Sequence, residues 1–137
     1  MNQTSSKAAQ RPPESESVTL DCDHILTYAG GDYGQLVLLC ANFLYELPIY
    51  RLRLSNALAR RETMAAECAV QHLSNCLIVF GSNPMVTTME TLTAALRLGR
   101  RKQARAEWLR LQTQLDVLVP QVQRLMLEVA SPQGTVQ

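Results

Sequence analysis

The sequence of 137 residues contains few aromatic side chains, two histidines and little net charge. Aromatic residues make up 5% of the chain and hydrophobic residues as a whole 47%, so its core would be packed mainly through aliphatic side chains. No apolar run approaches the roughly 20 residues that a membrane-spanning helix needs. The net charge of +1 gives no indication of a nucleic-acid partner. These absences favour a single helical domain without a membrane segment.

Motifs of autonomous catalysis are also missing. The chain has no glycine-rich phosphate loop, no catalytic-triad order of serine, histidine and aspartate, and no carboxylate pair on a polar helix face. We therefore expect neither intrinsic enzyme activity nor a cofactor. The cysteines are expected to be small core residues of a cytoplasmic protein rather than a disulfide framework, because they fall inside predicted helices and follow no signal peptide. They are Cys22, Cys40, Cys68 and Cys76.

Helical periodicity divides the chain into three parts. Residues 1–18 are polar and are expected to form a disordered leader, and residues 131–137 are expected to fray. Residues 19–130 hold the predicted helices, at about 21–28, 32–59, 62–81, 84–98 and 101–129. Because the links between the four long helices are short, the predicted fold is all-α, an antiparallel up-down-up-down four-helix bundle with a short N-terminal capping helix. The expected core includes Leu73, Leu77, Phe80, Leu92, Leu96, Trp108, Leu111 and Leu115.

Two prolines fall inside predicted long helices. A proline removes one intrahelical donor and clashes with the preceding turn. We expect Pro48 to kink or locally break the first long helix near residues 44–47, and Pro120 to bend the last one.

Residues 66–82, AECAVQHLSNCLIVFGS, form the most informative segment. On a 3.6-residue period its apolar side chains make one continuous stripe, typical of a helix that faces a bundle core. The members of this stripe are Ala66, Ala69, Val70, Leu73, Leu77 and Phe80. The other side carries a mostly polar strip that is expected to be exposed and to be the place for surface chemistry. The members of this strip are Glu67, Gln71, Ser74, Asn75 and Ile78.

Several segments between residues 20 and 127 follow one another at a characteristic spacing. They are the opening LDCDHILTYAGGDYGQL, the segment FLYELP, the acidic residue Glu62, and Gly81 with Gly99 eighteen residues later. As a series they resemble the histidine-containing phosphotransfer (HPt) family of two-component phosphorelays. The resemblance implies a signal-transduction module that docks the receiver domain of a response regulator or of a hybrid histidine kinase.

The family motif, H-x-L-K-G with a glycine ten residues after the histidine, is altered in this chain. With Leu73 and Gly81 as anchors, Gln71 stands at the histidine position. Ser74 stands at the lysine position and Asn75 at the glycine position. Phosphotransfer needs an imidazole nucleophile and a nearby cation, and these positions supply neither. The resemblance therefore implies a pseudo-HPt domain, which docks a receiver through the strip of residues 67–78 without accepting phosphate.

His72 offers an alternative phosphoacceptor one residue further on. One residue turns a side chain by about 100° around the helix, so His72 falls on another flank than Gln71 and is expected to be partly buried at a helix–helix seam. A phosphotransfer carrier that uses His72 is the alternative. Cys68, His72 and Cys76 cannot share one zinc ion, because the outer two lie about 12 Å apart along the helix. No metal site is predicted.

Basic residues gather at two predicted helix connections, which an up-down-up-down bundle places at the same end. We call this group the basic end: Arg60, Arg61, Arg97, Arg100, Arg101, Lys102 and Arg105. Such a group can engage an acidic receiver surface, a phosphate or nucleic acid, or is simply solvated while it complements a helix C-terminus. A helical scaffold that binds an acidic partner through the basic end is therefore a further alternative.

Overall fold

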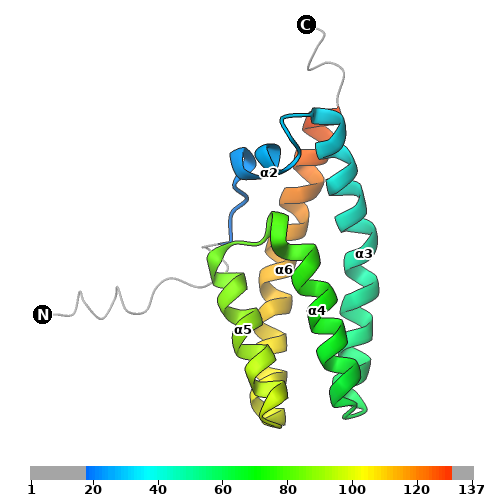
Figure 1. Cartoon of the computed structure of the whole chain (residues 1–137), viewed down its shortest axis with the longest axis vertical. Coiled ribbons are helices and arrows are strands. Elements are labelled where there is room, and N and C mark those ends of the chain that lie inside the picture. Colours follow the sequence, from blue (N-terminus) through cyan, green and yellow to red (C-terminus); the bar gives the residue numbers. More distant parts are fainter. Residues whose placement is uncertain (1–17, 131–137) are drawn as a thin grey trace, which may run out of the picture.

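The computed structural model describes residues 18–130, which contain five helices and no strand (Figure 1). The helices are α2 (Cys22–Tyr28), α3 (Tyr33–Ala59), α4 (Thr63–Phe80), α5 (Asn83–Arg97) and α6 (Arg101–Ala130). The predicted all-α class is confirmed, and each helix begins and ends within one residue of its predicted bounds. None of the helices in this part of the chain has the length and apolar character needed to cross a membrane. The predicted leader, apart from Val18, and the predicted frayed tail lie outside the described residues.

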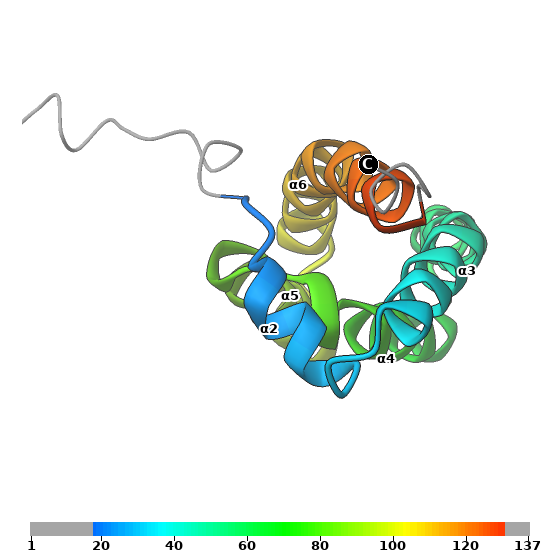
Figure 2. The ribbon, with the colours of Figure 1, turned by 90° about the horizontal axis from the view of Figure 1, so that it is seen from above.

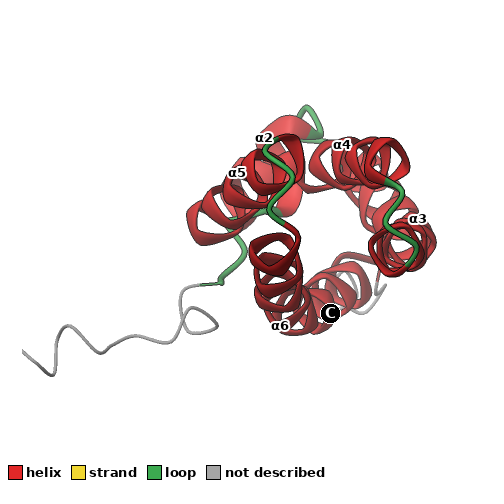
Figure 3. Ribbon diagram, turned by 90° about the horizontal axis from the view of Figure 1, so that it is seen from below, coloured by secondary structure: helices red, strands yellow, loops and turns green. Residues whose placement is uncertain are grey.

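The four long helices surround a common core. Helix α3 packs against α4 and α6, and α5 packs against the same two helices (Figure 2). The short helix α2 lies over one end of the long helices, where it contacts α3 and α4. Short loops join the helices, as the view from below shows (Figure 3).

Local signals in the sequence account for the helix ends. Asp21 and Asp32 cap α2 and α3, since their carboxylates accept the backbone N–H groups of His24 (3.0 Å) and Gln35 (3.1 Å). Helix α5 is followed by Gly99, whose φ of 71° suits a residue without Cβ. The link after α3 makes the same left-handed turn at Arg61, with a φ of 60°, which the sequence does not signal.

Neither proline interrupts its helix. Helix α3 runs without a break through Pro48, and α6 runs through Pro120. The predicted local break near residues 44–47 is therefore wrong. Both proline side chains are exposed, so the missing backbone donors lie on the solvent side of the helices.

The core is formed by the side chains that the helical periodicity predicted to face inward. All eight predicted core residues are buried. The rings of Phe43 and Phe80 pack at 4.7 Å between centroids and join α3 to α4. Val18 is also buried, although it was expected to end the leader. The side chain of Gln121 on α6 holds this segment, because its amide donates to the Val18 carbonyl (2.8 Å) and its Oε1 accepts the Leu20 N–H (3.0 Å).

One buried polar side chain gives a stability prediction. Gln114 is fully buried, and its Oε1 has no hydrogen-bond partner among the described residues. Its amide donates only a long bond of 3.4 Å to the Pro84 carbonyl, which also accepts the Thr88 hydroxyl at 2.9 Å. Gln114→Met should therefore raise the free energy of unfolding by about 1 kcal/mol, because it removes the unpaired oxygen and leaves the Pro84 carbonyl paired. Urea denaturation measures this change, and a loss of stability would show that Oε1 has a partner.

Candidate functional site

The polar strip predicted on the central helix lies along α4, and we call it the α4 strip: Glu67, Gln71, Ser74, Asn75 and Ile78. Gln71, Asn75 and Ile78 are exposed. Glu67 and Ser74 are only partly exposed, although the strip was predicted to be exposed. The Gln71 amide donates to Asn75 Oδ1 one turn away (3.4 Å). Leu73, two residues from Gln71, is fully buried, so the inward and outward faces of α4 are as predicted.

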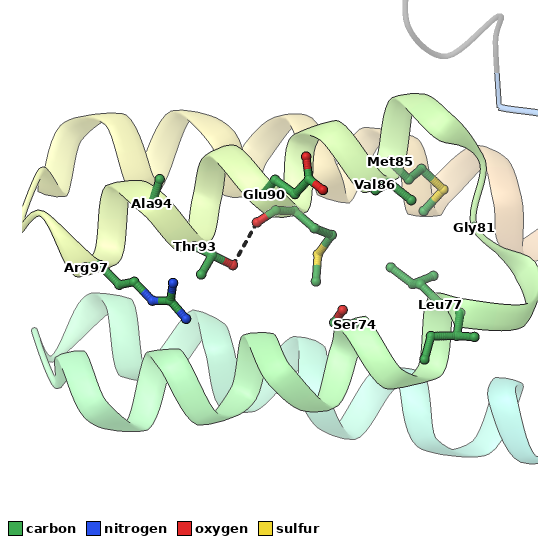
Figure 4. Close-up of a pocket in the computed structure, with 11 residues that line it drawn as sticks. Ser74, Leu77, Gly81, Met85, Val86, Glu90, Thr93, Ala94 and Arg97 are labelled. Carbon is green, nitrogen blue, oxygen red and sulfur yellow. Dashed lines mark hydrogen bonds between the residues drawn. The ribbon is translucent and has the colours of Figure 1, made fainter.

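A groove between α4 and α5 adjoins the α4 strip (Figure 4). Its volume is about 570 Å³, and Ser74 and Ile78 of the strip belong to its lining. Buried Met85 and exposed Val86 of α5 make the end near Gly81 apolar, and Arg97 lies at the far end. We call it the α4–α5 groove. An apolar hollow beside an exposed branched side chain is suited to hold an apolar group of a partner.

Gly81 ends α4 at the apolar end of this groove. Its N–H donates to the Leu77 carbonyl at 2.7 Å. A Cβ atom at position 81 would lie 2.8 Å from the same carbonyl oxygen, so the turn into α5 has no room for a side chain. Steric exclusion thus gives a physical reason for glycine at the position that the family motif also reserves for it.

His72 lies on another face of α4 than Gln71, at the α3–α4 seam. The imidazole stacks on the Tyr50 ring with 4.8 Å between centroids and 13° between planes. The predicted seam position is correct, but the predicted partial burial is wrong, because His72 is exposed. Tyr50 covers one face of the imidazole, and beyond it a hollow of about 370 Å³ opens to solvent. Arg53 and Arg60 contribute to the lining of this hollow.

The cysteines differ from the prediction that all are core residues. Only Cys40 is buried, whereas Cys22 and Cys68 are exposed and Cys76 is half-buried. The Cys76 thiol donates to Glu46 Oε1 at 3.7 Å. Burial and, after it, the Glu46 carboxylate raise the pKa of the Cys76 thiol to about 11, so the thiol stays protonated at neutral pH. All four thiols are free, and residues 18–130 contain no group of three potential metal ligands among His, Cys, Asp and Glu.

The seven residues of the basic end are all exposed. The α3–α4 and α5–α6 connections lie at the same end of the molecule (Figure 1), and Arg61, Arg100 and Arg101 line one small hollow there. No acidic side chain of the described chain forms an ion pair with any of the seven. The basic end therefore presents positive charge to solvent, with the exposed Glu62 carboxylate in the same hollow.

The α4 strip was predictable from the sequence, but the groove beside it was not. The α5 wall of the groove depends on the distance between two helices, which helical periodicity does not give. Met85 and Met89 at a spacing of four residues were the available signal, because flexible methionine side chains are common on adaptable binding surfaces. Tyr50, the stacking partner of His72, was likewise not identified from the sequence.

Comparisons of the chain with family models, with curated proteins and with solved structures find no match. The candidate function therefore depends on the residues and their geometry alone.

Proposed function

We propose that the chain is a pseudo-HPt domain of a two-component phosphorelay, built as an antiparallel up-down-up-down four-helix bundle. It docks the receiver domain of a response regulator or of a hybrid histidine kinase through the α4 strip and does not accept phosphate. The pairing of α3 and α5 with both α4 and α6 supports this arrangement, as does the hollow shared by the two connections at the basic end. The proposal places the protein in the cytoplasm, where phosphorelay receivers act.

The observation that carries the proposal is the environment of three motif positions on α4. Gln71 is exposed at the position where the resemblance expects the phosphoacceptor. Leu73, the motif leucine, is fully buried. Gly81 has no room for a Cβ atom. Each of these three positions has the burial or the steric limit that the motif requires, whereas Gln71, Ser74 and Asn75 replace the motif's histidine, lysine and glycine.

The chemistry of the α4 strip supports docking without phosphotransfer. A phosphoacceptor must offer a free nucleophilic lone pair, and an amide such as that of Gln71 has none of comparable reactivity. Its amide is also engaged by Asn75. Ser74 provides no cation to stabilise a phosphoryl group, and Arg97 lies at the other end of the α4–α5 groove (Figure 4). A receiver bound here would make contact without a covalent step.

The apolar part of the site supplies the docking energy. Ile78 is 58% exposed and lines the α4–α5 groove, whose apolar end also presents Val86. A partner that covers these side chains removes apolar surface from water, which is worth about 25 cal/mol per Å². The polar neighbours Gln71 and Asn75 form the rim.

Ile78→Asp tests this proposal. The substitution should weaken binding of a receiver domain from the source organism by about 1–3 kcal/mol, because it places an unpaired charge in the contact. The melting temperature should stay nearly unchanged, since Ile78 is exposed. Isothermal titration calorimetry measures the affinity. Leu109→Asp is the matched control, because Leu109 on α6 is 64% exposed and lies outside the groove. Equal binding by the wild-type protein and Ile78→Asp would contradict the proposal.

The exposure of His72 favours a second candidate, a phosphotransfer carrier that uses this histidine. Its imidazole is reachable from solvent, and Arg53 and Arg60 in the same hollow offer positive charge. Acid-labile phosphate that appears on the wild-type protein and disappears in His72→Ala would establish this candidate.

The unpaired charges of the basic end favour a third candidate, a scaffold that binds an acidic partner. Receiver binding that survives Ile78→Asp but is lost on reversal of Arg101 and Arg105 to glutamate would place the contact there.

A further inference from the structure

Helix α3 has a second apolar face that the bundle does not use. Its inner face packs into the core through Leu36, Cys40, Phe43, Leu47, Leu54 and Ala57. A separate row of side chains faces solvent, and we call it the outer stripe: Leu38, Asn42, Tyr45, Ile49, Leu52 and Asn56. At about 100° per residue the two faces lie roughly 150° apart around the helix. The outer stripe therefore points away from the core, and it contains none of the residues of the α4 strip.

The outer stripe follows a heptad repeat. Leu38, Tyr45 and Leu52 follow one another at intervals of seven residues. A second row, Asn42, Ile49 and Asn56, has the same interval, and each of its members lies four residues after a member of the first row. This is the a and d spacing with which one helix packs against another in a coiled coil. The other exposed leucines in the described helices, such as Leu109, do not form such a row.

We propose that the outer stripe of α3 pairs with the outer stripe of a second copy of this chain, with the two helices antiparallel. In the proposed register Ile49 faces Leu52 of the second copy at the centre, and Tyr45 faces Asn56 of the second copy on either side. The contact spans residues 42–59 of each α3, roughly 26 Å at 1.5 Å per residue. A net charge of +1 leaves little general repulsion between two copies.

Charge complementarity sets the direction and the register. Glu46 and Arg53 occupy successive e positions beside the outer stripe, and both are exposed. In an antiparallel pair e positions face e positions, so this register brings Glu46 within about one helical turn of Arg53 of the second copy. Symmetry makes the contact twice. A slip by one heptad would set Glu46 against Glu46 of the second copy.

A parallel pair lacks this complementarity. There the e positions of one helix face the g positions of the other. The g positions are Ala41, Pro48 and Ser55, which carry no charge. They are small or compact residues, so they allow two α3 helices to approach closely. Pro48 and Ser55 lie on the α6 side of the stripe. The antiparallel arrangement is the one in which all flanking charges find partners.

Sedimentation velocity over a range of protein concentrations tests the dimer. The wild-type chain should dimerise, and Leu52→Lys should raise the dimer dissociation constant at least tenfold, because it places a charge at the centre of the contact. Leu109→Lys is the matched control, since Leu52 and Leu109 are 62% and 64% exposed, and it should dimerise like the wild type. A wild-type chain that is monomeric throughout, or a dimer that survives Leu52→Lys, would overturn the proposal. A monomer in which Leu52→Lys abolishes receiver binding would assign the stripe to that partner and would also overturn it.

Charge exchange tests the antiparallel register. Glu46→Arg alone and Arg53→Glu alone should each weaken self-association at least tenfold, because each sets like charges against each other twice. An equimolar mixture of the two variants should form a heterodimer, in which both opposite-charge contacts return. The double variant should dimerise with itself. Native mass spectrometry distinguishes these species, and a mixture that remains monomeric would overturn the antiparallel pairing.

Discussion

Trp108→Ala is expected to lower the free energy of unfolding by about 3–5 kcal/mol, the largest effect of any single substitution considered. Trp108 is buried on α6, and its indole N–H donates to the Ser55 hydroxyl of α3 at 3.1 Å. Truncation removes a large apolar side chain from the place where these two helices pack, and it leaves a cavity that the surrounding helices can fill only in part. It also leaves the Ser55 hydroxyl without its donor.

Urea denaturation followed by circular dichroism measures this loss, because Trp108 is the only tryptophan and its removal abolishes tryptophan fluorescence. Trp108→Phe keeps an aromatic ring but removes the hydrogen bond, so it should cost less than the alanine variant. Leu109→Ala, at the exposed neighbouring position, should change stability by less than about 0.5 kcal/mol. A loss of similar size for Trp108→Ala and Leu109→Ala would contradict the packing of α6 against α3.

The helices were predictable because their determinants are local. The 3.6-residue period directed Leu73, Leu77 and Phe80 inward, and all three are buried. Asp32 and Gly99 mark helix ends through contacts within a few residues of themselves. These signals lie within each helix and do not depend on its neighbours. The bounds of all five helices could therefore be predicted from them.

Features that depend on the space between helices were not predictable in the same way. Periodicity gave the direction of His72, but its exposure depends on how far Tyr50 extends from α3. The same limit explains Cys68, which lines the hollow beside His72 and is exposed. The half-burial of Cys76 beside Glu46 likewise depends on α3–α4 spacing.

Two further features escaped sequence reasoning for different reasons. Arg61 adopts a left-handed conformation without a glycine, which is imposed by the link between α3 and α4. The heptad spacing of the outer stripe is present in the sequence. It did not stand out, because the apolar residues of the inner face already accounted for the helical periodicity of α3. Only the burial pattern separates the two faces.

On the proposed function, changing α4 to the HPt motif should make the protein a phosphate acceptor. The wild-type chain is expected to take up no acid-labile phosphate from a phosphorylated receiver that it binds. The triple variant Gln71→His, Ser74→Lys and Asn75→Gly should become labelled. Gln71 is exposed, so an imidazole at this position can meet the aspartyl phosphate of a docked receiver. Lysine at position 74 would add the missing cation.

The experiment is best done in a His72→Ala background, which removes the second candidate acceptor. Radiolabelled phosphate on the triple variant, stable in base and lost in acid, is the expected result. Asn75→Gly should cost about 1 kcal/mol of stability, because glycine weakens a helix interior. Gln71→His with Ser74→Lys alone is therefore the control for folding. If the variant binds the receiver with wild-type affinity but stays unlabelled, Gln71 does not occupy the acceptor position and the HPt proposal fails. Labelling of the variant beside an unlabelled wild type would instead locate the lost function in the side chains at positions 71, 74 and 75.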